Sequence, residues 1–388
     1  MRGSWLLGGA FAAAALYALA ATGCQPAGRR SEPGAARAIH GGSQSTGISS
    51  DRREAPGGLS LFGDRPEYED VPFENRVIAN LARHSFTTDG LDFDPDVCDR
   101  LGLLVFASTR NSERPDIFLK SLDGTALTQV TSDPADDIQP RFSPDGDRIA
   151  FCSNRGGSWD IWMTNRDGTE FTQLTRDPGD EVAPSWSPDG AQIAYSAWGS
   201  RSHQWEIWTL ATQHPGIRRF LAYGMFPAWS PDGKRIALQR ARQRGSHLFS
   251  IWTIDLADGE ALHPTEVAHE DAAACIAPSW SPDGALLVYC VVPDGPAPSM
   301  ATDGTPSAAD LWVVELRSGL RMRLTDGAEA CFNPAWARDG RVFFVSARSG
   351  TENIWSLTTE LGSYAGGHPD PARTTTTEQD ATSAMSGN

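Results

Sequence analysis

The sequence predicts an all-β protein, a six-bladed β-propeller with four antiparallel strands per blade, from three observations. First, the string Pro-x-Trp/Phe-Ser-Pro-Asp-Gly recurs along the chain. Second, short apolar runs of strand length follow each copy in the same order. Third, a strand-like segment precedes the first repeat, and the last repeat lacks a fourth strand. We therefore expect the last blade to be closed by an N-terminal strand.

The recurring string gives the number of repeats. Four complete copies, one decayed copy at 334–340 and one more strongly decayed copy at 91–97 make six. Their aromatic positions are separated by 49, 44, 43, 51 and 56 residues. A period of about 40–50 residues is typical of propeller blades. The aromatic positions are Phe93, Phe142, Trp186, Trp229, Trp280 and Trp336.

Each repeat contains the parts of a four-stranded sheet. Ser-Pro-Asp-Gly is a turn, because Pro presets φ, Asp bonds its own backbone and Gly allows positive φ. An apolar run such as Arg148–Phe151 follows at once, so the two form a hairpin. A third run carries Ile-Trp, as in Asp160–Trp162, and a fourth ends in Leu-Thr, as in Leu174–Thr175.

The two ends of the repeat array complement each other. No fourth strand-like run follows Ile354–Trp355, whereas Val77–Leu81 precedes the first repeat without a partner. We expect Val77–Leu81 to be the fourth strand of the last blade, which would remove a free sheet edge. An open β-solenoid is the alternative and would not need this strand. The propeller is expected to occupy residues 76–361.

Residues 1–23 have the character of a secretory signal. Arg2 is followed by the apolar stretch 5–21, and small residues then precede Cys24. This arrangement resembles a bacterial lipoprotein signal, which implies that Cys24 is lipidated and begins the mature chain. Gln25 is not Asp, so the same resemblance implies the outer membrane, on its periplasmic or surface side. An ordinary signal peptide, or an uncleaved anchor helix with a chance cysteine, is the alternative.

The segments on both sides of the propeller have the composition of solvated chain. Residues 24–75 are expected to be the lipidated cysteine and a flexible tether, rich in Gly, Ser, Arg, Ala and Pro. Residues 362–388 are mostly small and polar, and are expected to be a disordered tail.

Composition excludes several classes of protein. The 33 basic and 49 acidic residues give a formal charge of −16, which argues against a nucleic-acid partner, because phosphates require a basic face. Six cysteines in 388 residues do not make a disulfide scaffold. No apolar run of about 20 residues follows the N-terminal stretch, so the body of the chain is not expected to span a membrane.

A search for catalytic motifs gives no constellation. The sequence has no Gly-x-Ser-x-Gly elbow, no His-Glu-x-x-His helix and no Gly-rich phosphate loop. We therefore expect a non-enzymatic binding module without a cofactor. A propeller enzyme acting on a polysaccharide as a lyase or hydrolase is one alternative. A sensor that binds a small ligand, Ca²⁺ or another divalent metal in the central channel is another.

Two cysteines occupy the same place in neighbouring repeats. Cys275 and Cys331 each lie five residues before the aromatic position of their repeat. The six corresponding residues are expected to form a ring near one mouth of the channel. A Cys275–Cys331 disulfide and a metal site are the two chemical options, and unconnected free thiols are the alternative. The corresponding residues of the other repeats are Thr88, Asp137, Glu181 and Gly224.

Acidic residues gather in the loops that lead into the innermost strands. These loops should face the same channel mouth, where carboxylates attract cations or basic partner segments. Simple solvation is the alternative, because Asp is also a common turn former. The candidate partner-binding residues are Asp136, Asp137, Asp180, Glu181, Asp271 and Glu329.

The repeat resembles the TolB-type propeller repeat. The resemblance rests on Pro-x-Trp-Ser-Pro-Asp-Gly, on the Ile-Ala-Phe run after it, on Ser-x-Arg at Ser153–Arg155 and Ser346–Arg348, and on Ile-Trp. It covers about residues 76–361. TolB carries an α/β domain before its propeller, and we do not expect that domain in the segment before residue 76. The chain thus looks like a lipoprotein variant of a TolB-like propeller.

This resemblance implies a function in the bacterial cell envelope. In TolB-like propellers the channel mouth is where partner proteins dock, so the expected partner is an envelope protein such as a Pal-like lipoprotein. Similar repeats occur in oligogalacturonate lyases, which bind a metal in the channel through His and other ligands. We expect a monomeric propeller that meets the membrane through the lipid on Cys24. The histidines available for a lyase-type site are His203, His214, His247, His263 and His269.

Overall fold

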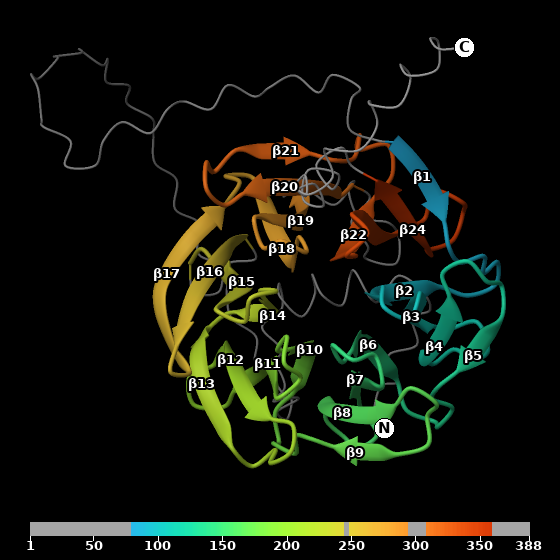
Figure 1. Cartoon of the computed structure of the whole chain (residues 1–388), viewed down its shortest axis with the longest axis horizontal. Coiled ribbons are helices and arrows are strands. Elements are labelled where there is room, and N and C mark those ends of the chain that lie inside the picture. The colour runs from blue at the N-terminus through green and yellow to red at the C-terminus, as the bar shows by residue number, and fades with distance from the viewer. Residues whose placement is uncertain (1–78, 244–247, 294–307, 359–388) are drawn as a thin grey trace, which may run out of the picture. The chain divides into compact units, whose positions relative to one another are not determined.

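The computed structural model describes residues 79–243, 248–293 and 308–358. These residues contain 24 strands in six four-stranded antiparallel sheets. The sheets stand as blades around a central channel (Figure 1), so the expected six-bladed propeller is confirmed. In the described ranges there is no helix of the length and apolar character needed to cross a membrane.

Blades 1 to 3 follow one another along the chain, each with its first strand innermost and its fourth at the outer edge. Blade 1 comprises β2 (Asp92–Cys98), β3 (Leu103–Ser108), β4 (Asp116–Ser121) and β5 (Leu127–Gln129). Blade 2 comprises β6 (Asp137–Phe142), β7 (Arg148–Ser153), β8 (Asp160–Asn165) and β9 (Phe171–Gln173). Blade 3 comprises β10 (Glu181–Trp186), β11 (Gln192–Gly199), β12 (Gln204–Ala211) and β13 (Arg218–Tyr223).

Blades 4 to 6 repeat the plan, and the last blade takes its outer strand from the N-terminal side of the chain. Blade 4 comprises β14 (Met225–Trp229), β15 (Arg235–Ala241), β16 (Phe249–Ala257) and β17 (Glu260–Ala268). Blade 5 comprises β18 (Ala273–Trp280), β19 (Leu286–Pro293), β20 (Asp310–Glu315) and β21 (Arg321–Arg323). Blade 6 comprises β22 (Cys331–Trp336), β23 (Arg341–Ser346), β24 (Asn353–Thr358) and β1 (Ala79–Arg83).

The hydrophobic core lies between the blades. The second strands of blades 1, 2 and 6 are almost wholly buried, because neighbouring blades pack on both of their faces. In β3, β7 and β23 every residue after the first is buried. These strands therefore read as continuous apolar runs, without the alternation of a strand that has one wet face.

The ring is closed by β1, as the sequence predicts. This strand pairs antiparallel with β24, with Ala82 opposite Ser356. The described strand ends at Arg83, two residues beyond the expected end at Leu81, and residues 77–78 lie outside the described range. The hydrogen bond from His84 N to the Ile354 carbonyl (2.8 Å) continues the pairing beyond the strand.

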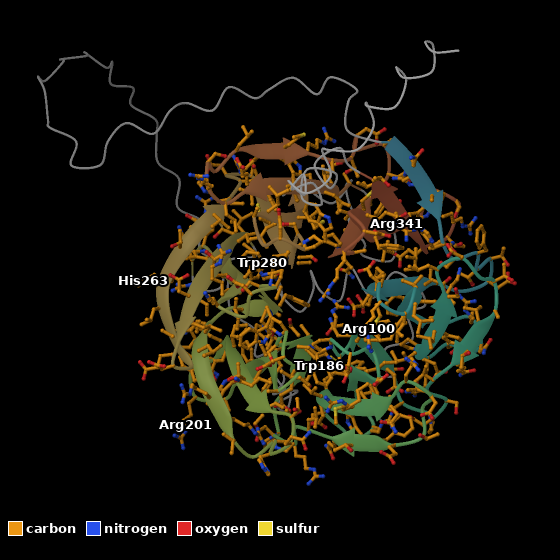
Figure 2. All side chains as sticks on the ribbon, viewed as in Figure 1. Arg100, Trp186, Arg201, His263, Trp280 and Arg341 are labelled. Atoms are coloured by element: carbon orange, nitrogen blue, oxygen red, sulfur yellow. The ribbon has the colours of Figure 1, made fainter. Side chains whose placement is uncertain are left out.

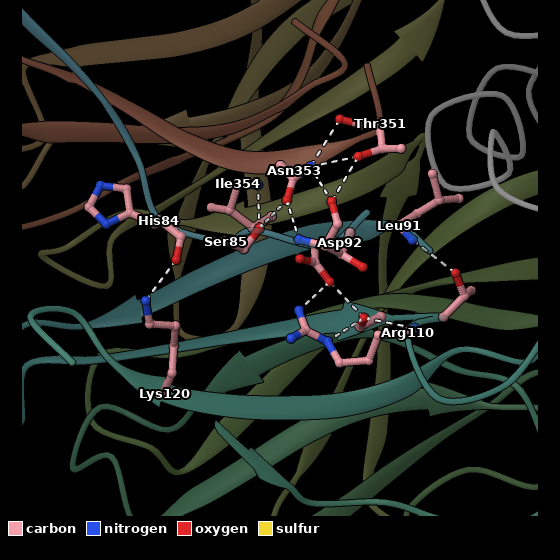
Figure 3. Close-up of polar contacts among 12 residues, drawn as sticks. His84, Ser85, Leu91, Asp92, Arg110, Lys120, Thr351, Asn353 and Ile354 are labelled. Atoms are coloured by element: carbon pink, nitrogen blue, oxygen red, sulfur yellow. Dashed lines mark hydrogen bonds and ion pairs between the residues drawn. The ribbon is translucent and has the colours of Figure 1, made fainter. Parts of the chain in front are cut away.

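A buried polar network reinforces this closure (Figure 3). Asn353 Oδ1 accepts hydrogen bonds from Ser85 Oγ at 3.2 Å and from Thr87 N at 3.0 Å. From blade 1, the buried Lys120 Nζ donates to the His84 carbonyl at 2.7 Å. The segment after β1 is thus tied both to the last strand of the ring and to its first blade.

The Ser-Pro-Asp-Gly turns form because their side chains bond their own backbone. In blade 2, Ser143 Oγ donates to the Asp145 carboxylate and accepts from Arg148 N at 3.0 Å. The Gly146 N–H donates to the Ser143 carbonyl at 2.8 Å with a φ of 72°, a conformation that favours glycine. The same Ser–Asp pairing recurs in blades 3, 4 and 5. The recurring Asp is therefore a turn residue, as expected from its presence in several repeats.

Each innermost strand carries a β-bulge just before its first proline. At this point the pairing with the second strand shifts by one residue, and the bulged residue has a positive φ of 49–56°. Bulges redirect side chains, and here they do so at the wall of the channel. The six bulged residues are Asp94, Gln139, Ala183, Phe226, Ala277 and Asn333.

The register of the first repeat differs from the sequence-based expectation. Val97 pairs with Leu104 as Phe142 pairs with Ile149, so Val97 is the equivalent of Phe142 and Phe93 is not. The predicted register of this repeat is therefore wrong by four residues, because Pro95 is the proline that follows the bulge and not the proline of the turn. Asp96 is therefore not a turn residue. The ring position assigned to Thr88 belongs to Asp92.

The expected signal peptide, Cys24 lipid site, tether and C-terminal tail lie outside the described residues. They remain predictions from the sequence.

Candidate functional site

The channel contains a cavity of about 600 Å³ in the half nearer the Ser-Pro-Asp-Gly turns. A cavity of this size suits a small organic ligand. Its wall is made by the inner strands of all six blades, through the bulged residues, the residue after each first proline and the aromatic positions. Figure 2 shows Trp186 and Trp280 toward the centre of the ring, and Arg201 and His263 at its outside.

Contacts between neighbouring blades hold the aromatic side of this cavity. Trp186 Nε1 donates to the Arg141 carbonyl of blade 2 at 3.1 Å, and Trp280 Nε1 donates to a carbonyl of blade 4 at 2.8 Å. The Arg148 guanidinium lies 5.0 Å from the Trp186 ring centre, and the Arg235 guanidinium lies 4.7 Å from that of Trp280. The wall is therefore rigid before anything binds.

The charged side of the cavity comes from blades 1, 2 and 6. Asp94 accepts hydrogen bonds from Asn333 Nδ2 at 2.7 Å and from Gln139 N at 3.2 Å, and so links three blades. Burial raises the pKa of Asp94 to about 6, against the opposing effects of Arg141 and these two hydrogen bonds. Asp94 is thus a buried carboxylate that is mostly ionised at neutral pH.

Asp96 and Arg141 lie on the same side. Asp96 accepts a hydrogen bond from Phe142 N at 2.8 Å, and burial raises the pKa of Asp96 to about 6. Part of its surface stays open to the cavity. Arg141 lines the cavity and donates to the Pro140 carbonyl at 2.8 Å. Among the described residues, Arg141 forms no ion pair with a carboxylate.

The opposite mouth holds the six acidic residues expected to bind a partner, but two of them are buried. Asp137 is 0 % exposed and Glu181 is 1 % exposed. A docked partner cannot reach either side chain. Both belong to the internal packing of their blades.

Asp137 is held by the arginine of the Ser-x-Arg turn. Arg155 Nη2 lies 2.9 Å from Asp137 Oδ2, and the guanidinium lies 4.7 Å from the centre of the Trp162 ring. Blade 1 repeats this arrangement, with Arg110 at 2.6 Å from Asp92. The Ser-x-Arg motif therefore places an arginine between a buried carboxylate and the aromatic residue of the third strand.

Glu181 is buried in its protonated, uncharged form. Burial, together with Asp177 and Asp160, raises the pKa of Glu181 to about 9, so it is protonated at neutral pH. One oxygen of Glu181 and one of Asp160 are buried without another donor among the described residues. A proton shared between the two carboxyl groups satisfies both oxygens.

The other four acidic residues are accessible to different degrees. Asp271 is exposed and lies 3.3 Å from Arg242, and Glu329 is exposed. Asp136 and Asp180 are half-buried and accept hydrogen bonds from a neighbouring asparagine and a main-chain N–H, respectively. Most carboxylates here have an arginine or hydrogen-bond partner, so the acidic character of this mouth is weaker than the sequence suggests. Asp271 and Glu329 are the residues best placed to meet a partner.

Of the options for Cys275 and Cys331, the structure has the unconnected one: both cysteines are buried free thiols. Cys331 stands where blades 1 and 2 have an aspartate, and its sulfur accepts a hydrogen bond from Arg348 Nη2 at 3.4 Å. Burial raises the pKa of Cys275 to about 12 and that of Cys331 to about 11, which makes both thiols unreactive. In the described residues there is no group of three or more His, Cys, Asp or Glu side chains arranged to hold a metal ion.

Sequence reasoning missed the charged side of the cavity. The decayed string at 91–97 predicts a turn at Asp94 and Asp96, and position 141 is the variable residue of the string. The signal that could have found them is the residue after the first proline. With the first repeat in its observed register, this position is charged in blades 1 and 2 and small in the others.

Comparison with known proteins identifies the family. A family model described as the tricorn protease N-terminal β-propeller domain matches residues 158–378, more than half of the chain. The chain belongs to this propeller family. Its propeller fold is shared with a TolB-type protein of known structure.

Solved structures with the same fold include a TolB-type protein from Agrobacterium tumefaciens, with a TM-score of 0.52 and 18% identity. That alignment covers 71% of this chain and 96% of the other. An oligogalacturonate lyase from Vibrio parahaemolyticus aligns with a TM-score of 0.50 and 14% identity over 72% of this chain and 93% of the other. Identities this low show the fold alone, and they do not choose between a binding protein and an enzyme.

An uncharacterized protein of Agrobacterium fabrum, Atu1656, is 32% identical to this chain over 79 residues. The match spans 20% of this propeller chain and 23% of that relative.

Proposed function

We propose that this propeller is a non-enzymatic protein-binding scaffold of the bacterial cell envelope, anchored by a lipid on Cys24. The observation that carries the proposal is the closed ring, in which loops and channel walls are fixed by bonds within and between blades. A rigid surface loses little conformational entropy when a partner binds, so it suits a docking role.

We propose the loop end that bears Asp271 and Glu329 as the docking surface. Both carboxylates are exposed and border the channel mouth opposite the cavity. A basic segment of an envelope protein, such as a Pal-like lipoprotein, would complement them. The TolB-like fold supports this choice of partner class.

In vivo crosslinking followed by affinity capture from membranes tests the docking surface. The informative variant is Asp271→Lys/Glu329→Lys, which inverts two exposed charges at the loop end. Asp137 and Glu181 are unsuitable, because a buried lysine would unfold the blade. We expect the wild-type protein to capture an envelope protein and the variant to lose it.

The matched control inverts two exposed charges at the opposite end, in Asp147→Lys/Glu170→Lys. We expect this control to capture the same partner as the wild type. If the control loses the partner and the first variant keeps it, docking occurs at the cavity end and the proposed surface is wrong. If no protein is captured by any form, the scaffold proposal fails, and glycan cleavage should be assayed instead.

Anchoring is tested separately with Cys24→Ser. We expect wild-type protein in the membrane fraction, with metabolic incorporation of labelled palmitate. The variant should incorporate no label. Equal labelling of both forms would refute lipidation at Cys24.

A further inference from the structure

The cavity in the channel is divided by chemistry into two sides. Blades 1, 2 and 6 contribute the charged and polar side chains, chiefly Asp94, Asp96, Arg141 and Asn333. The exposed Arg338 and the rings of Phe142 and Trp336 come from the same blades. Blades 3, 4 and 5 contribute aromatic rings and small side chains, including the half-buried Phe226. A ligand that fills the cavity must therefore be polar at one end and apolar at the other.

The charged side presents both signs. Asp94 and Asp96 are carboxylates that can accept hydrogen bonds from an ammonium group, and Asp96 has surface open to the cavity. Arg141 donates to a main-chain carbonyl and forms no ion pair within the described chain, so its guanidinium retains donors for an anion. The charge of Arg141 also acts on Asp94 and Asp96, but neither carboxylate lies within ion-pair distance of it, so its N–H groups can still donate to a ligand carboxylate.

We infer that the cavity binds a small zwitterion with an apolar substituent, namely a free α-amino acid with an aliphatic or aromatic side chain. The ammonium group would lie at Asp94 and Asp96, and the carboxylate at Arg141. The apolar substituent would pack against Phe226 and the tryptophan wall. This site is at the opposite end of the channel from Asp271 and Glu329, and ligand binding does not depend on partner docking.

Isothermal titration calorimetry on the purified full chain tests the inference. The probes are L-phenylalanine, L-leucine, L-methionine and L-tryptophan, each titrated to millimolar concentrations. For the tightest binder, the N-acetyl derivative removes the cation and the amide removes the anion. We expect each derivative to bind at least about tenfold more weakly, because each leaves a charged protein group without its partner.

Two variants assign the ends of the ligand. Arg141→Met should bind the amino acid and its amide equally, because the group that selects the carboxylate is gone. Asp96→Asn should lose its preference for the free ammonium over the N-acetyl form. The matched control is Arg176→Met, an exposed arginine at the other mouth, which should behave as wild type. Circular dichroism confirms that each variant is folded.

Three results would overturn the inference. Absence of binding by all four amino acids to the folded wild-type protein would show that the cavity does not take this class of ligand. Equal binding of an amino acid, its amide and its N-acetyl form would show that the charged side makes no selection. A wild-type preference that persists unchanged in Arg141→Met and Asp96→Asn would place the binding site elsewhere.

Discussion

At the scale of single residues, one position of the repeat shows two ways in which a buried carboxyl group is stabilised. The first residue of the inner strand is Asp92 in blade 1 and Asp137 in blade 2, and each carboxylate has an arginine partner. In blade 3 the residue is Glu181, and Gly199 stands where Arg155 stands in blade 2. Without an arginine, Glu181 retains a proton and shares it with a neighbouring carboxylate. The environment, and not the residue type, decides the charge.

Replacement of Glu181 by Gln should change how stability depends on pH. The pKa of Glu181 is about 9 in the folded protein and about 4.5 when unfolded. The folded state therefore binds more protons, and the free energy of unfolding falls as pH rises from about 4.5 to about 9. Glu181→Gln keeps a donor for Asp160 and removes this dependence. We expect its melting temperature, relative to wild type, to increase by a few degrees between pH 6 and pH 9.

Thermal unfolding at several pH values provides the measurement. Glu170→Gln, at an exposed position, is the control and should track the wild type. A difference between Glu181→Gln and wild type that stays constant across the pH range would show that Glu181 is ionised in the folded protein.

Replacement of Arg155 should lower the free energy of unfolding. Arg155→Met leaves the fully buried Asp137 without its cation, and breaking a buried ion pair destabilises by about 3 kcal/mol. Arg166→Met is the control, because Arg166 lies 3.6 Å from Asp147 and both are more than a third exposed. Exposed pairs contribute about 0–1 kcal/mol. Urea unfolding measures the free energy of unfolding of both variants. Equal losses would show that the Arg155–Asp137 pair stabilises the fold no more than an exposed pair does.

At the scale of elements, the sequence predicts most strands and their order, since Pro-x-aromatic, Ser-Pro-Asp-Gly and Ile-Trp mark three of the four strands directly. The error in the first repeat has a physical cause. Asp94–Asp96 contains a Pro-Asp pair that resembles the turn, and only the bulge at Asp94 shows that Pro95 is the other proline of the string. Bulges change the register by one residue without leaving a sequence signal of their own.

The contact from Lys120 to the segment after β1 should stabilise the closure. Lys120→Met removes the donor to the buried His84 carbonyl, and an unsatisfied buried acceptor costs about 1–3 kcal/mol. The chain has only two lysines, and the exposed Lys234 supplies the matched control, Lys234→Met. We expect urea unfolding to show a lower free energy of unfolding for Lys120→Met and almost no change for Lys234→Met.

The same two lysines allow an independent measurement on the unaltered protein. An amine-acylating reagent should modify Lys234 quickly and Lys120 slowly, because Lys120 is buried and hydrogen-bonded. Mass spectrometry reports both rates. Similar rates for the two would mean that the closure opens often and that Lys120 does not hold it.

At the scale of the whole molecule, six repeats predict the ring, and the complementary ends predict its closure. The cavity, and the arginine and hydrogen-bond partners of the acidic side chains, could not be predicted in the same way. Both depend on which side chains of different blades meet. Asp94 and Asn333, 239 positions apart in sequence, form one hydrogen bond across the closure. Only the assembled ring brings such residues together.

Deletion of the closing strand should loosen one blade before the others. A chain that begins at residue 86 lacks β1 and leaves β24 with an unpaired edge, whereas a chain that begins at residue 76 keeps β1. Hydrogen–deuterium exchange should be faster in β22–β24 of the shorter chain and nearly unchanged in β10–β13 of blade 3. Uniform acceleration in all blades would show that the ring opens as a single cooperative unit.

The antiparallel pairing of β1 with β24 also determines how the ring would respond to mechanical force. Ala79, at the start of β1, lies opposite Thr358, at the end of β24. Tension between the chain that precedes Ala79 and the chain that follows Thr358 would therefore act on adjacent strand ends. Such a load peels hydrogen bonds apart one after another instead of shearing them all together. The closure is thus the seam at which a pull on the two termini would open the propeller.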